Sequence, residues 1–106
     1  YYRLSRNATA GAMAFHLDAH GTSITSGTTD SGVVPAPNVW HWFAIEITDS
    51  GSATQIRAKV WPAGDAEPAA WQIDCLDASS TRRTAGRIGV WSSAAVASYW
   101  DDFEVQ

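Results

Sequence analysis

The residues best suited to contact a ligand are four tryptophans that fall on four predicted strands: Trp42, Trp61, Trp91 and Trp100. Each lies opposite the apolar positions of its own strand, so we expect its side chain to point away from the core. Exposed aromatic planes stack against the C–H faces of sugar rings, so a row of them would form a glycan platform. The alternative is that they pack under a loop, against a neighbouring module or against another subunit.

A second candidate chemistry is glycoside hydrolysis, which needs two carboxylates on opposite sides of the scissile bond. Asp102 and Glu104 share one face of a predicted strand near the end of the chain. A further glutamate beside them is absent, and Glu46 and Glu67 have no carboxylate nearby in the sequence. We therefore expect no catalytic residue, and we expect Glu67 to brace its own loop. A hydrolase would need carboxylates supplied by further strands.

Metal binding is the third candidate chemistry. Carboxylate and carbonyl oxygens at strand ends can hold a structural calcium ion, and five aspartates have such positions: Asp18, Asp30, Asp65, Asp77 and Asp101. No dense Asp-x-Asp-x-Asp-Gly loop is present, so solvated turn aspartates are expected, with structural calcium as the alternative. His16, His20 and His41 lack the spacing of a zinc site. We expect no metal site and no cofactor.

Two individual residues are candidates for covalent modification. Cys75 is the only cysteine, so it cannot form an internal disulfide. Its place on the apolar side of a predicted strand indicates a small buried hydrophobic residue, the alternative being a reactive or intermolecular thiol. Residues 7–9 match the N-glycosylation acceptor pattern at Asn7, a tripeptide that also occurs often by chance.

Composition limits the class of protein. The chain has 106 residues, which we interpret as a single domain over residues 1–106. Charged residues make up 17%, below the usual ~25%, which together with many small polar residues suits an extracellular or cell-surface β-protein. A net charge of −4 argues against nucleic acid as a partner. No run of ~18 apolar residues occurs, so membrane insertion is not expected.

Short segments with the alternation of a strand are separated by clusters of turn residues along the chain. This pattern predicts an all-β, antiparallel protein whose strands position the residues described above. The predicted strands are residues 2–5, 12–18, a weak one at 22–25, 39–49, 55–61, 70–75, 86–92 and 98–105. The side chains predicted to face the core are Met13, Phe15, Leu17, Phe43, Ile45, Ile47, Ile56, Ala58, Val60, Trp71, Ile73 and Cys75.

Turn residues separate the central strands. Residues 49–52, Asp-Ser-Gly-Ser, are predicted to form a hairpin turn. Pro62 is predicted to end the strand 55–61, because it cannot donate to the ladder. Gly64 and Pro68 then mark a loop before the next antiparallel strand. Residues 77–83 are predicted to form a loop that includes at most one helical turn.

Four blocks carry a resemblance to a known family: residues 40–47, 59–71, 85–91 and 99–105, the last an aromatic-Asp-Asp-Phe strand. In order and spacing the chain resembles the concanavalin A-like, laminin G-like jelly rolls of bacterial surface and secreted proteins. The resemblance implies an antiparallel jelly-roll sandwich and a structural role for Asp101. It covers the later part of such a domain, which commonly runs to ~200 residues. We therefore expect either a shorter variant or a fragment completed by other strands.

Two functions from different classes follow. The first is a non-catalytic extracellular binding or adhesion module whose expected ligand, as the resemblance implies, is carbohydrate. The second is a structural subunit of an extracellular filament or surface assembly, since open sheet edges are templates for further strands. The expected partners are accordingly carbohydrate or neighbouring copies of the chain.

Overall fold

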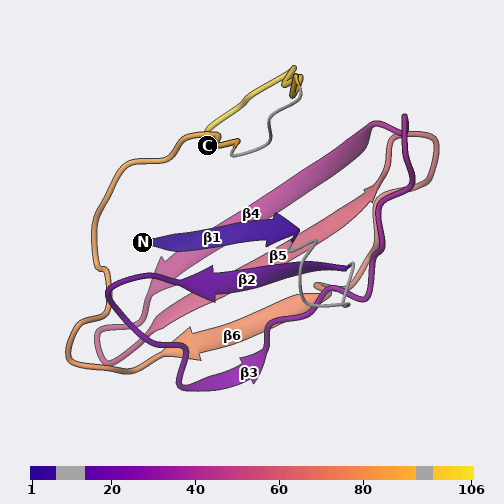
Figure 1. Cartoon of the computed structure of the whole chain (residues 1–106). Helices are drawn as coiled ribbons and strands as arrows, with labels where there is room; N and C mark the ends of the chain where they lie inside the picture. Colours follow the sequence, from indigo (N-terminus) through magenta and orange to yellow (C-terminus); the bar gives the residue numbers. More distant parts are fainter. Residues whose placement is uncertain (7–13, 93–96) are drawn as a thin grey trace.

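The computed structural model describes residues 1–6, 14–92 and 97–106, whose six strands form two antiparallel sheets (Figure 1). One sheet has the order β1-β2 and the other the order β3-β6-β5-β4. The strands are β1 Tyr2–Arg6, β2 Phe15–Ala19, β3 Ser26–Thr28, β4 His41–Asp49, β5 Thr54–Pro62 and β6 Ile73–Asp77. No helix occurs within the described ranges, which confirms the predicted all-β class.

Strand β5 is the centre of the four-stranded sheet and follows the predicted alternation. Ile56, Ala58 and Val60 are fully buried, whereas the residues between them are only partly buried. The strand ends at Pro62, as predicted. A short turn joins β4 to β5: the Ser50 amide donates to the Ala53 carbonyl at 2.9 Å, and Gly51 supplies a positive φ of 85°.

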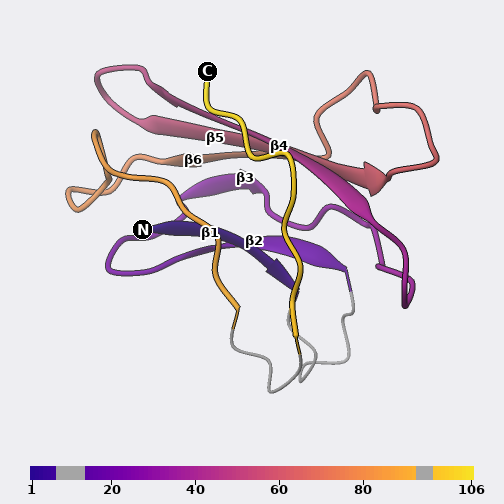
Figure 2. The ribbon, with the colours of Figure 1, turned by 90° about the horizontal axis from the view of Figure 1, so that it is seen from above.

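The core lies between the two sheets, which Figure 2 shows as separate layers. Leu17 of β2 packs with Ile56, Ala58, Ile73 and Cys75 of β5 and β6. These five side chains are at most 4% exposed, which confirms the predicted inward positions in β2, β5 and β6 and the buried setting of Cys75. The partly buried side chains packed against this cluster are Tyr2, Leu4 and Ile24.

Strand β4 departs from the prediction. Phe43, Ile45 and Ile47 pair with Val60, Ala58 and Ile56, so they share the core face of the sheet, but they are 39%, 51% and 50% exposed. The reason is that the core side chains of β1 and β2 pack against β5 and β6, while β4 lies at the edge of the sheet. Phe43 still meets Phe15 edge to face, with ring centroids 5.2 Å apart.

The predicted closing strands are wrong. Residues 86–92 and 98–105 form neither a strand nor a bridge. Their apolar side chains are exposed, as at Ile88 (60%) and Phe103 (62%). Alternating apolar residues permit an extended chain, but a strand also needs a neighbouring edge to accept its backbone hydrogen bonds. The structure pairs these segments with no such edge.

The region around β3 also differs. The weak strand predicted at residues 22–25 is replaced by β3, which pairs with β6 so that Gly27 lies opposite Cys75. A Cβ at Gly27 would lie 2.4 Å from the Asp74 carbonyl oxygen, so the close approach depends on glycine. Residues 12 and 13 of the predicted second strand, including Met13, lie outside the described residues, as does Asn7.

Candidate functional site

The outer face of the four-stranded sheet brings together two of the four predicted tryptophans. In the register of β4 and β5, Trp42 lies directly opposite Trp61. Directly opposite residues of an antiparallel pair project from the same face, with Cβ atoms ~5 Å apart. Val60, next to Trp61 in β5, is fully buried on the core side of the sheet, so both indoles are on the outer face. Trp42 is 42% exposed.

A third tryptophan lies over the same face. The Lys59 Nζ is 4.8 Å from the centroid of the Trp71 ring, and the Arg57 guanidinium carbon is 5.2 Å from it. The prediction that Trp71 points into the core is therefore wrong. Strand β6 begins only at Ile73, so the alternation that buries Ile73 and Cys75 does not reach back to Trp71.

Charged side chains continue the surface along the strands. Glu46 lies opposite Arg57, whose Nε donates to Glu46 Oε1 at 2.9 Å and whose Nη2 also contacts that oxygen. Lys59 Nζ lies 2.8 Å from Glu67 Oε1 and donates to the Pro68 carbonyl at 2.9 Å. Glu67 thus braces the loop between β5 and β6.

We call this surface the tryptophan face and define it by Trp42, Trp61, Trp71, Glu46, Arg57, Lys59, Glu67 and Asp74. Gln55 Nε2 donates to Asp74 Oδ1 at 2.8 Å at its β6 side. From Trp61 to Arg57 the face extends ~14 Å along β5, since a strand rises ~3.4 Å per residue. The polar members beyond the tryptophans were missed by sequence reasoning, although the outward alternation of Arg57, Lys59 and Trp61 carries the signal.

The other two predicted tryptophans lie elsewhere. Trp91 contacts the two-stranded sheet, where the Arg3 guanidinium carbon lies 4.9 Å from its ring centroid. Trp91 and Trp100 are 58% and 52% exposed. Trp100 belongs to an open hollow of about 440 Å³, which is lined by Gly89, Val90, Trp100, Asp101, Asp102 and Phe103. The four tryptophans therefore do not form one row.

Protein groups bind several of the aspartates considered for calcium. Asp18 accepts from Arg3 Nη2 and Ser5 Oγ, each at 3.3 Å. Asp30 accepts from the Gly32 amide at 2.7 Å, and Asp101 accepts from the Asp102 amide at 2.9 Å. In the described part of the chain, no three His, Cys, Asp or Glu side chains are grouped in a way that could hold a metal ion.

Of the other two candidate aspartates, Asp65 is exposed in the loop between β5 and β6, and Asp77 is fully buried at the end of β6. Its carboxylate accepts from the Tyr2 hydroxyl at 2.7 Å, from the Ser79 amide at 2.9 Å and from the Thr22 hydroxyl. Burial by itself raises the pKa of this carboxyl, but the hydrogen bonds from Ser79, Thr22 and Tyr2 outweigh it and hold the pKa well below its usual range.

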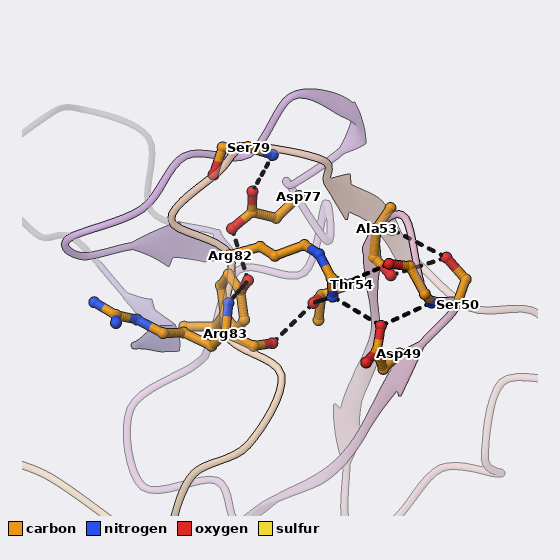
Figure 3. A network of polar contacts seen from close by, with 10 residues as sticks. Asp49, Ser50, Ala53, Thr54, Asp77, Ser79, Arg82 and Arg83 are labelled. Atoms are coloured by element: carbon orange, nitrogen blue, oxygen red, sulfur yellow. Dashed lines mark hydrogen bonds and ion pairs between the residues drawn. The ribbon is translucent and has the colours of Figure 1, made fainter.

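A second group of polar contacts adjoins Asp77 (Figure 3). Thr54, also fully buried, donates to the Arg83 carbonyl at 2.8 Å. Arg82 bonds Asp49 at 2.7 Å and the Gly51 carbonyl at 2.6 Å. These bonds fix the 77–83 loop to the β4–β5 turn, so we assign the whole network a structural role. Sequence reasoning missed it because its members come from four separate segments.

Among the described residues, no helix has the length and apolar character needed to cross a membrane. Comparison with protein-family models, with curated protein sequences and with solved structures finds no significant match to this chain.

Proposed function

We propose that this chain is a non-catalytic carbohydrate-binding module of jelly-roll type that works outside the cell. The observation that carries the proposal is the pair Trp42 and Trp61, two neighbouring indoles on the outer face of a sheet. The aromatic planes would stack on sugar rings, and the charged groups beside them would hydrogen-bond sugar hydroxyls.

The arrangement suits binding better than hydrolysis. Glu46 and Glu67, the carboxylates near the indoles, are each engaged by a cation. In a glycosidase the two carboxylates face the scissile bond from opposite sides, whereas these two are turned toward Arg57 and Lys59. Asp102 and Glu104 lie in the C-terminal segment, which forms no strand to hold them on one face. These features favour a binding role.

Titration of the purified chain with oligosaccharides, followed by calorimetry and tryptophan fluorescence, tests the proposal. Trp42→Ala and Trp61→Ala should each weaken binding about tenfold, since the loss of one aromatic contact costs about 1.4 kcal/mol. Trp91→Ala is the matched control, because Trp91 contacts the other sheet and should leave affinity unchanged. Equal affinity in all three variants and the unmodified chain would refute the platform.

A second function is favoured by one specific observation. Among the described strands, β4 is at the edge of its sheet, and it exposes Phe43, Ile45 and Ile47. An open edge beside an apolar face can pair with a strand of another copy, which would make the chain a subunit of a filament or surface assembly. The mass and symmetry of the particle in solution separate the two functions. A monomer that responds to oligosaccharide favours binding, and ordered multimers without any response favour assembly.

A further inference from the structure

We propose that the tryptophan face selects neutral saccharides over sulfated or uronic-acid-rich ones. This inference rests on the proposed function and names its ligand class. Recognition of anionic glycans requires lysine and arginine charges that are free to meet sulfate or carboxylate groups. Both cations of the tryptophan face are already neutralised inside the protein.

Arg57 is held by its cross-strand partner. Its Nε and Nη2 both bond Glu46 Oε1, and its guanidinium lies over Trp71. The pair therefore turns two donors of the guanidinium fork toward a carboxylate of the protein. A ligand anion would have to compete with Glu46 for them, and it gains little from a charge already matched.

Lys59 is enclosed more completely. Its side chain is only 12% exposed, and its ammonium contacts Glu67, the Pro68 carbonyl and the Trp71 ring. An ammonium has three donor hydrogens, and these neighbours satisfy it from several sides. Lys59 therefore holds the β5–β6 loop and Trp71 in place, and it offers no accessible charge to a ligand.

The groups that do face the solvent are acidic. The side chains of Glu46 and Glu67 are 43% and 56% exposed, more than those of their partners Arg57 (31%) and Lys59 (12%). Asp74 adds a third carboxylate, so the face has three acidic groups against two basic ones. The chain as a whole carries −4. Both the acidic groups of the tryptophan face and the net negative charge of the whole chain repel an anionic ligand.

The same carboxylates suit a neutral sugar. The two ion pairs use Oε1 of Glu46 and Oε1 of Glu67. A carboxylate has about four acceptor positions, so sugar hydroxyls can donate to Oε2 of each. Stacking on Trp42 and Trp61 with hydroxyl donation to these oxygens requires no net charge on the ligand.

Calorimetry with three sets of soluble probes at low and high salt tests this inference: neutral cello-, manno- and xylo-oligosaccharides, oligogalacturonides, and heparin oligosaccharides. We expect the neutral probes to bind best, with an affinity that changes less than about twofold with salt, because uncharged ligands are little affected by screening. Glu46→Gln with Glu67→Gln removes the carboxylate that neutralises each cation and should raise the affinity for heparin oligosaccharides about fivefold at low salt. Asp74→Asn is the control, because it removes an acidic charge without freeing a cation.

The outcomes separate the two proposals. Tighter, salt-dependent binding of anionic probes by the unmodified chain would overturn the inference and leave carbohydrate binding standing. A free-energy gain in Asp74→Asn that is half or more of the gain in the double variant would also overturn it, because Asp74→Asn removes one negative charge and the double variant removes two, and net charge rather than the paired cations would then set the preference. If none of the probes binds, the proposed function itself fails. Circular dichroism on each variant confirms that the sheet is retained.

Discussion

Removal of the buried carboxylate at position 77 should destabilise the protein more than any other single loss of charge. Asp77 lies at the end of β6, while its donors Tyr2 and Thr22 lie in β1 and in the segment after β2. The hydrogen bonds therefore tie the two sheets together at one end. We predict that Asp77→Ala lowers the free energy of unfolding by about 3–5 kcal/mol.

The magnitude follows from the partners that would remain. A hydrogen bond to a charged group contributes ~1.5–3 kcal/mol, and Asp77 accepts three. Thr22 Oγ1 keeps its contact with Ser79 Oγ at 3.0 Å, and the Tyr2 hydroxyl still accepts from the Arg83 amide at 3.1 Å. The loss in the free energy of unfolding is therefore smaller than the sum of three such hydrogen bonds. It remains a large part of the ~5–15 kcal/mol that stabilises a typical domain.

The dependence on pH has a definite sign. The pKa of Asp77 is lower in the folded protein than the ~3.9 of an unfolded chain. The stability due to ionised Asp77 is thus fully present above about pH 4 and is lost as the pH falls toward the folded pKa. Asp77→Asn lacks this contribution at every pH, so the difference in stability between it and the unmodified chain should narrow below about pH 4.

Urea unfolding, followed by circular dichroism from neutral pH to about pH 3, measures both effects. Asp74→Asn is the matched control, because Asp74 is on the same strand but exposed, and it should change stability by no more than about 0.5 kcal/mol. Equal midpoints for the two asparagine variants at neutral pH would refute the argument. A stability difference that stays constant down to pH 3 would refute the assigned pKa shift.

Two further predictions concern β3 and β6. Gly27→Ala should lower the free energy of unfolding by about 2 kcal/mol or more, because residue 27 has a φ of +97° and the new Cβ would lie 2.4 Å from the Asp74 carbonyl oxygen. Gly51→Ala is the control: at a φ of +85° and with nothing within 4 Å of the new Cβ, it should cost about 1 kcal/mol in the same urea titration. Equal losses in the two variants would contradict the close approach at Gly27. The Cys75 thiol is 1% exposed and burial raises its pKa to about 11, so Ellman's reagent should label it only as fast as the protein opens. Immediate labelling in native buffer would show that β6 is accessible.

The sequence predicts β5 well because the information needed is local, whereas β6, predicted at residues 70–75, spans Ile73–Asp77. The alternation of Ile56, Ala58 and Val60 defines one buried face, and Pro62 stops the strand. The same kind of pattern in residues 86–92 and 98–105 predicts strands that are absent. Alternation specifies which side of a strand is apolar, but it does not specify a partner edge, and a strand requires both.

The candidate site depended on register in the same way. Asp49 of β4 pairs with Thr54 of β5. Counting the same number of residues back along β4 and forward along β5 from this pair reaches Trp42 and Trp61, which lie opposite one another. The Asp-Ser-Gly-Ser turn predicted at residues 49–52 would instead pair Asp49 with Ser52 and place Trp42 opposite Lys59, so the pairing of the two tryptophans could not be predicted from it. Trp71 could not be predicted by such counting, because it precedes β6 and its position depends on Lys59 and Arg57 beneath it. Neither could Trp91, which depends on a contact with Arg3 from the far end of the chain.

The two candidate functions use opposite faces of one strand. Trp42 and Glu46 of β4 point to the tryptophan face, whereas Phe43, Ile45 and Ile47 point to the core side, where they remain largely exposed although Phe43 contacts Phe15 of β2. Since side chains alternate along a strand, a change at Trp42 leaves the apolar side intact, and a change at Ile45 leaves the tryptophans intact. Carbohydrate binding and assembly therefore do not exclude one another in this fold. Assembly through the core side of β4 would cover the exposed isoleucines while leaving Trp42 and Trp61 open to a ligand.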